Sequence, residues 1–88
     1  MTRDEIQSEL TLFFKEEFEI KDIVLDEDLR EAHGFDSIDA IELLRQIEIM
    51  LDTELTRDEK EMALEIRTFN QILDYVESLV SSILLRTN

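Results

Sequence analysis

The segment from His33 to Leu44, HGFDSIDAIELL, sets the expected fold of this chain and contains its only Gly and its only His. Gly34 tolerates positive φ, so it predicts a sharp turn. Asp36 is suited to an N-cap, with Asp39 three residues further on. Apolar residues then recur at helical spacing, namely Ile38, Ile41, Leu44, Ile47 and Leu51. We therefore expect a helix from Ser37 to Leu51 whose apolar face packs inward.

Ser37 is the first residue of this expected helix and lies next to the predicted turn. The first turn of a helix points free N–H groups outward and carries positive partial charge, which favours a bound phosphate. A serine in this position is therefore a candidate attachment point for a phosphate-linked group.

Three capping boxes mark further helix starts, because in each a hydroxyl residue is followed three residues later by Glu or Gln. They are Thr2 with Glu5, Thr56 with Glu59, and Thr68 with Gln71. The first predicts a helix from about Arg3 to Phe18, whose aromatic residues we assign to the core. The second opens a helix that includes Met62, Ala63, Leu64 and Ile66. The third opens a helix at Phe69 with an apolar face of Ile72, Leu73, Tyr75, Val76, Leu79, Val80 and Ile83.

The segment from Glu19 to Phe35 lacks a long helical pattern, so we expect an ordered loop with a short turn near Asp28 to Ala32. Loops of this length are often functional. The chain has no Pro and no composition typical of a linker. We expect a single domain over residues 1–88. Its predicted class is all-α: a small four-helix bundle with three main helices, a shorter third helix and a long loop between the first two.

Composition excludes several classes of protein. The chain has no Cys and a single His, so it lacks the ligands for a Cys or His metal site. The only Gly is in the wrong place for an EF-hand, so we reject that motif and expect no metal site, with weak divalent binding by the clustered acids as the alternative. No apolar run approaches the roughly 18 residues of a transmembrane helix. The first residues lack an apolar signal segment, and we expect a cytoplasmic protein.

The net charge of −14, from 23 acidic and 9 basic residues, disfavours binding to nucleic acid or to an anionic membrane. It favours basic surfaces on protein partners. Solubility alone is the alternative explanation of this charge.

The sequence Gly34-Phe35-Asp36-Ser37-Ile38, followed by an acidic helix, resembles the signature of the acyl carrier protein family. The resemblance covers nearly the whole chain. The segment Asp52 to Leu55 matches the family after its second helix, and FNQILDYV, from Phe69 to Val76, matches the start of its last helix.

The resemblance implies that Ser37 carries a covalent 4′-phosphopantetheine arm, that Asp36 supports the transferase or its metal, and that Gly34 forms the turn. The arm's thiol would carry acyl groups for fatty acid, polyketide or specialised lipid biosynthesis. The implied partners are a phosphopantetheinyl transferase, an acyl-ACP synthetase or acyltransferase, and ketosynthase-type enzymes. We expect a monomer that is a carrier and not an enzyme.

Two further sets of residues follow from the resemblance. The expected partner-binding face consists of Asp36, Asp39, Glu42, Arg45 and Glu48. The expected acyl-chain lining consists of Ile38, Ile41, Leu44, Leu64 and Ile66. The sequence departs from the family at Arg45, where an apolar contact is common, and at Ile49, where an acid is common. The segment before Phe69 is also longer than usual, which predicts a longer third helix.

Three alternatives to an acyl carrier stay open. The first is an aminoacyl or peptidyl carrier of the same fold, and the second is a non-carrier acidic module that binds a basic protein. The third and least favoured is an enzyme. A nucleophilic serine needs a nearby base, and His33 is the only local candidate. We expect His33 to be structural and half-buried under the loop, with a pH-sensitive loop as the alternative.

Overall fold

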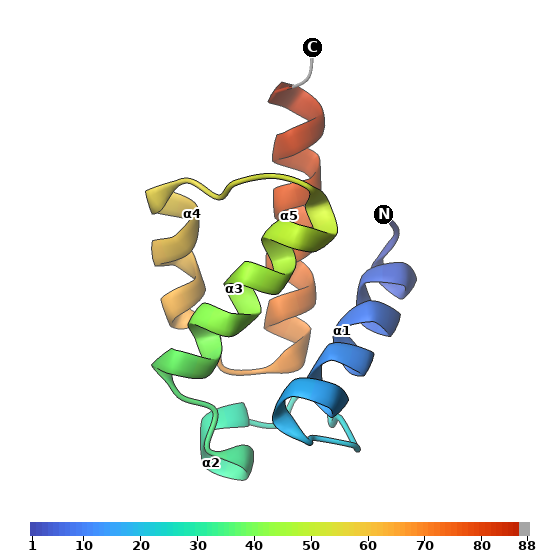
Figure 1. Ribbon diagram of the computed structural model, residues 1–88, viewed down its shortest axis with the longest axis vertical. Helices are drawn as coiled ribbons and strands as arrows, with labels where there is room; N and C mark the ends of the chain where they lie inside the picture. The colour runs from blue at the N-terminus through green and yellow to red at the C-terminus, as the bar shows by residue number, and fades with distance from the viewer. Residues whose placement is uncertain (87–88) are drawn as a thin grey trace.

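The computed structural model describes residues 1–86, and these residues form helices joined by loops, with no strand among them (Figure 1). The elements are α1 (Arg3–Phe18), α2 (Leu29–His33), α3 (Ser37–Leu51), α4 (Arg57–Met62), the 3₁₀ turn η1 (Ala63–Glu65) and α5 (Phe69–Arg86). The all-α bundle is confirmed, and so are the predicted ends of α1 and α3 and the predicted start of α5. The last two residues of the predicted domain lie outside the described residues.

The three predicted capping boxes are all present. The Glu5 amide donates to Thr2 Oγ1 at 3.2 Å, and the Thr2 amide donates to Glu5 Oε1 at 2.9 Å. The same reciprocal pair joins Thr56 to Glu59 at the start of α4. At the start of α5 the Gln71 amide donates to Thr68 Oγ1, and the Thr68 amide donates to Gln71 Oε1. Local sequence therefore fixes where these helices begin.

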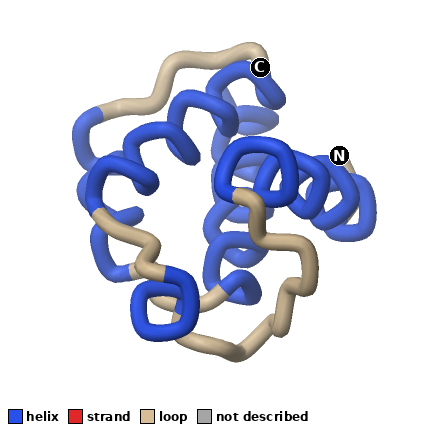
Figure 2. Tube along the Cα trace, turned by 60° about the horizontal axis from the view of Figure 1, so that its bottom comes forward, coloured by secondary structure: helices blue, strands red, loops and turns tan. Residues whose placement is uncertain are grey.

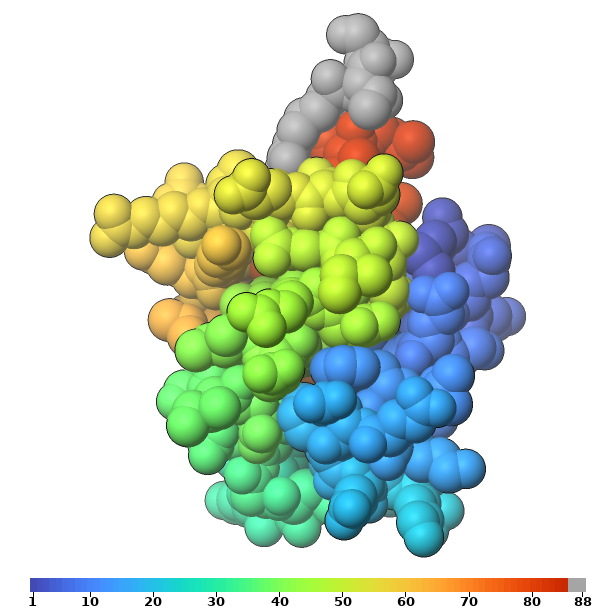
Figure 3. Space-filling view, in the orientation of Figure 1, coloured from blue at the N-terminus to red at the C-terminus, as the bar shows by residue number. Residues whose placement is uncertain are grey.

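The core lies where α1, α3 and α5 face one another, and α1 packs along α5. Its fully buried side chains are Ile6, Leu10, Phe14, Leu29, Ile47, Phe69, Ile72, Leu73 and Val76. In Figure 3, α3 crosses the front of the molecule between α1 and the α4 segment. Beyond this core, α5 continues to Arg86, with Leu84 and Leu85 exposed.

The loop between α1 and α3 is ordered, and it contains the predicted short turn as α2, which Asp28 caps (Figure 2). Hydrogen bonds tie this loop to the start of α5. The Leu29 amide donates to the Arg67 carbonyl at 2.8 Å, and the Asn70 amide donates to the Leu25 carbonyl at 3.0 Å. The Asn70 side chain also donates to Asp26 Oδ1 at 2.6 Å. These bonds hold α2 and the turn after it against the bundle.

The prediction of a third helix that includes Ile66 is wrong. The α-helix ends at Met62, three residues of 3₁₀ turn follow, and Ile66 has an extended backbone with φ −68° and ψ 133°. Ala63 is the residue of this segment that enters the core, whereas Met62 and Leu64 are 63% and 58% exposed. A single buried position gives little packing energy to extend a regular helix, since most helical stability in proteins comes from a buried face.

Within residues 1–86, every helix is too short or too polar to cross a membrane.

Candidate functional site

The turn between α2 and α3 depends on Gly34, which has φ +66° and ψ 25°. Its amide donates to the Arg30 carbonyl at 3.0 Å, and the Phe35 amide donates to the Leu29 carbonyl at 3.2 Å, which closes the end of α2. A Cβ atom at Gly34 would meet no atom within 4 Å. Glycine is therefore favoured here by its backbone conformation and not by lack of space.

Phe35 anchors this turn in the core, where it is 7% exposed. Its ring stacks on Phe14, with centroids 5.8 Å apart and planes at 10°, and it meets Phe18 edge-on at 5.5 Å. Aromatic pairs in these arrangements add to the energy of burial. Phe35 therefore fixes where the chain enters α3.

Asp36 is the N-cap of α3, as the sequence predicts. Its Oδ1 accepts the amides of Ile38 at 3.0 Å and Asp39 at 3.1 Å. The Asp39 carboxylate in turn accepts the Asp36 amide at 3.1 Å, which completes a capping box. Both acids, which the sequence places on a partner-binding face, are therefore also used to start the helix.

Ser37 is the first residue of α3 and is exposed. Within the part of the chain that the structure describes, no hydrogen bond engages its hydroxyl. The side chain therefore points into solvent at the positive end of the α3 dipole, two residues after the buried Phe35.

A small cavity of about 20 Å³ lies beside Ser37, between α3, η1 and α5. Leu44, Leu64 and Ile66 line it together with Ser37, as does Tyr75 from α5. Ile38 and Ile41 lie outside this cavity and are 68% and 60% exposed.

The prediction that Ile38 and Ile41 pack inward is therefore wrong. Phe35 and the Asp36 cap fix the rotation of α3 so that Ala40, Leu43, Leu44 and Ile47 face the core. This stripe has the helical spacing i, i+3, i+4, i+7. It keeps Leu44 and Ile47 of the predicted stripe but has Ala40 and Leu43 in place of Ile38 and Ile41, a choice that hydrophobicity alone does not make.

The acidic face of α3 is only partly free. Glu42 is half-buried and Arg45 is exposed. Glu48 Oε2 accepts the Leu55 amide at 2.8 Å, so this carboxylate holds the connector after α3 against the helix. Glu48 therefore has a structural contact that the sequence does not reveal.

The sequence identifies Tyr75 only as a core residue, but its hydroxyl donates to the backbone carbonyl of Glu59 at 2.5 Å. Burial, followed by the nearby charges of Glu59 and Glu48, raises the pKa of Tyr75 to about 12. The sequence feature that points to this hydrogen bond is that Tyr75 is the one polar aromatic residue on an otherwise apolar stripe.

His33 ends α2, and its Nε2 lies 3.0 Å from Glu27 Oε1 in the same loop. Its side chain is 27% exposed, although the residue as a whole is exposed, so the predicted half-buried position is met by the side chain alone. This contact pairs His33 with a loop carboxylate and does not involve Ser37.

The sequence model of the family described as "phosphopantetheine attachment site" matches residues 8–76, which include the whole region around Ser37. The chain belongs to this family. Domains of the family bear a covalently attached 4′-phosphopantetheine and are carriers, not catalysts. Among curated proteins and solved structures, the searches found no match.

The residues present fit such a group. An unbonded, exposed hydroxyl is available at Ser37, and the helix dipole favours a phosphodiester at this end of α3. The family resemblance drawn from the sequence is confirmed, and the carrier role implies modifying and cargo-handling enzymes as partners.

Proposed function

We propose that the chain is an acyl carrier protein and that Ser37 is the residue modified with 4′-phosphopantetheine. The observation that carries this proposal is the exposed, unbonded Ser37 hydroxyl on the first turn of α3, held in place by the Asp36 cap and the buried Phe35.

Attachment requires a nucleophile that a separate transferase can reach. The Ser37 Oγ attacks the phosphorus atom of coenzyme A that is linked to pantetheine, and 3′,5′-ADP leaves as the P–O bond to it breaks. The hydroxyl proton passes to a base of the transferase, because His33 is paired with Glu27. Asp36 holds the helix amides through Oδ1, so its second carboxylate oxygen would be available to the transferase and its Mg²⁺.

The attached group supplies a terminal thiol that carries cargo as a thioester. The chain's own contribution is to tether that cargo, which raises its effective concentration at each partner enzyme. The acidic residues Glu42 and Asp39, with the exposed Arg45, would orient basic enzymes on α3. The exposed Ile38 and Ile41 would give this surface an apolar centre.

An acyl cargo is supported by the apolar walls of the cavity beside Ser37, which include Leu44, Leu64 and Ile66. An aminoacyl or peptidyl cargo would place polar groups against these walls at a cost in free energy. The same apolar walls are the reason to prefer an acyl carrier over an acidic binding module, which needs no apolar lining beside Ser37. Fatty acid, polyketide and specialised lipid biosynthesis all use cargo of this class.

Mass spectrometry of the intact protein tests the attachment site. The protein is incubated with coenzyme A, Mg²⁺ and a phosphopantetheinyl transferase, alongside Ser37→Ala and Ser78→Ala. Ser78 is a matched control because it is an exposed serine within α5. We expect one phosphopantetheine adduct on the wild type and on Ser78→Ala, and none on Ser37→Ala. An adduct on Ser37→Ala would show that another residue is the attachment site. The absence of an adduct on folded wild-type protein would favour the non-carrier acidic module that binds a basic protein.

A further inference from the structure

Two voids of very different size share two lining side chains. The cavity of about 20 Å³ beside Ser37 and a groove of about 340 Å³ between α4 and α5 are both lined by Tyr75 and Ile66. Ser37 lines the cavity but not the groove, so Tyr75 borders both the void beside Ser37 and the larger groove.

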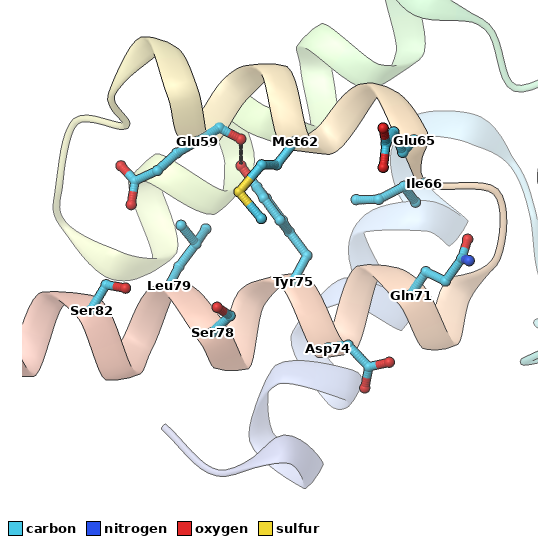
Figure 4. A pocket seen from close by; sticks show the side chains of 10 residues that line it. All are labelled: Glu59, Met62, Glu65, Ile66, Gln71, Asp74, Tyr75, Ser78, Leu79 and Ser82. Carbon is cyan, nitrogen blue, oxygen red and sulfur yellow. Dashed lines mark hydrogen bonds between the residues drawn. The ribbon is translucent and has the colours of Figure 1, made fainter.

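The groove has an apolar floor and a polar rim. Met62, Ile66 and Leu79 supply apolar side chains, and the residues of the rim are Glu59, Glu65, Gln71, Asp74, Ser78 and Ser82. Figure 4 shows Tyr75 pointing from α5 toward α4, so that its ring forms part of the groove wall.

Tyr75 is held firmly in this position. It is 8% exposed, and its hydroxyl donates to the Glu59 carbonyl at 2.5 Å. Moving the ring out of the way would break this bond and expose a side chain that is now almost fully buried, which costs free energy. The cavity on the Ser37 side has room for about one water molecule.

We propose that Tyr75 is a partition that limits the length of acyl chain the protein shelters, so that its cargo is a short acyl group. This inference rests on the proposed carrier function. The first carbons beyond the thioester enter between α3 and η1 by displacing Leu64, which is 58% exposed and has space to move. The chain then meets the Tyr75 ring, and further carbons stay in solvent. The apolar groove receives the distal carbons only when the ring is removed.

The experiment compares acyl chains of different length on wild type, Tyr75→Phe and Tyr75→Leu. Each protein is loaded at Ser37 from butyryl-, octanoyl- or dodecanoyl-coenzyme A, and loading is verified by intact mass. The rate at which hydroxylamine cleaves each thioester then measures how well the cargo is sheltered. Tyr75→Phe is the matched control, because it keeps the buried ring that forms the partition and removes only the hydrogen bond to Glu59.

On the wild type and on Tyr75→Phe, octanoyl and dodecanoyl thioesters should be cleaved at rates within about twofold of each other. Each further methylene group that is sheltered favours the buried form by up to about fourfold. On Tyr75→Leu, where the cavity joins the groove, the dodecanoyl thioester should therefore be cleaved at least about tenfold more slowly than on the wild type. Circular dichroism spectra and melting temperatures are to be recorded for the three proteins, to check that each is folded.

A second measurement needs no variant. Tyr75 is the only tyrosine, so ring-labelled tyrosine gives one set of NMR signals. These signals should shift between the butyryl and octanoyl forms and stay constant between octanoyl and dodecanoyl.

The partition would be overturned if the cleavage rate depended on acyl chain length in the same way for the wild type and a folded Tyr75→Leu. It would also be overturned if the NMR signals of Tyr75 in the wild type kept shifting from octanoyl to dodecanoyl. A wild type that accepts no adduct at all would instead overturn the carrier function, so the two failures are distinguishable.

Discussion

The Tyr75 hydroxyl donates to the Glu59 carbonyl across 2.5 Å, and this bond links α5 to α4. Burial of the ring, with the charges of Glu59 and Glu48 nearby, raises the pKa of the phenol from 10.0 to about 12. In the folded protein the neutral phenol is therefore favoured, because ionisation would place a negative charge in a buried site beside two carboxylates.

The raised pKa predicts how stability depends on pH. The unfolded chain loses the phenol proton near pH 10, whereas the folded chain keeps it until about pH 12. The stabilisation is therefore complete below pH 10 and is lost as the pH rises through 12. Absorbance titration should show the phenol ionising near 12, and the melting temperature should fall over this range. The melting temperature of Tyr75→Phe should fall less steeply as the pH rises. A phenol that titrates near pH 10 in the folded protein would contradict the prediction.

Asp36→Ala should destabilise the protein by about 1 kcal/mol, because the amides of Ile38 and Asp39 lose their cap. Asp36→Asn keeps an oxygen that accepts both amides, so its free energy of unfolding in urea should stay close to that of the wild type. The pair also separates the two roles of Asp36. If its charge serves the transferase, Asp36→Asn should be modified more slowly at Ser37 despite normal stability. Equal unfolding free energies for Asp36→Ala and the wild type would contradict the capping role.

Gly34→Ala should lower the free energy of unfolding by about 1–2 kcal/mol, because a residue with a Cβ is strained at φ +66°. No steric clash is expected, since the added Cβ meets no atom within 4 Å. Gly34→Asn is the comparison, because Asn tolerates left-handed backbone better than Ala. Denaturant unfolding should rank the three proteins Gly, Asn, Ala in order of decreasing stability. A more stable Gly34→Ala would show that the turn changes its backbone conformation.

Glu48→Ala should destabilise the protein by about 1 kcal/mol, because the Leu55 amide loses its acceptor while Leu55 itself is buried. Glu48→Gln retains an acceptor oxygen and should be nearly as stable as the wild type. If Glu48→Gln binds a partner enzyme more weakly, the loss is then due to the missing negative charge alone. If Glu48→Gln were as unstable as Glu48→Ala, the contact with Leu55 would depend on charge and not on the acceptor.

Added NaCl should raise the melting temperature, because a net charge of −14 causes repulsion within a small bundle. The ion pairs that Arg3 makes with Asp74 and Glu77 act in the opposite direction, since salt weakens them. Arg3→Gln removes these pairs and should show the larger rise with salt. A melting temperature that is constant or falls with salt would indicate that the net charge has little effect on stability.

Local signals in the sequence predicted most of the fold. The capping boxes at Thr2, Thr56 and Thr68 act through residues three positions apart, so each helix start is encoded where it occurs. The positions of Gly34 and Ser37 follow from the same kind of local chemistry. The end of α4 was not predictable in this way, because the 3₁₀ turn depends on Ala63 packing into the core.

By itself, the sequence determined the helices, their caps, the turn that presents Ser37 and the family signature, because each depends on contacts between residues close together in the chain. Only the tertiary structure decided which stripe of α3 is buried, since Phe35 must pack on Phe14 before the helix rotation is fixed. The tertiary structure also placed Tyr75 between the cavity beside Ser37 and the outer groove. That position depends on a bond to Glu59, 16 residues away. Packing of this kind combines distant segments, and no local pattern specifies it.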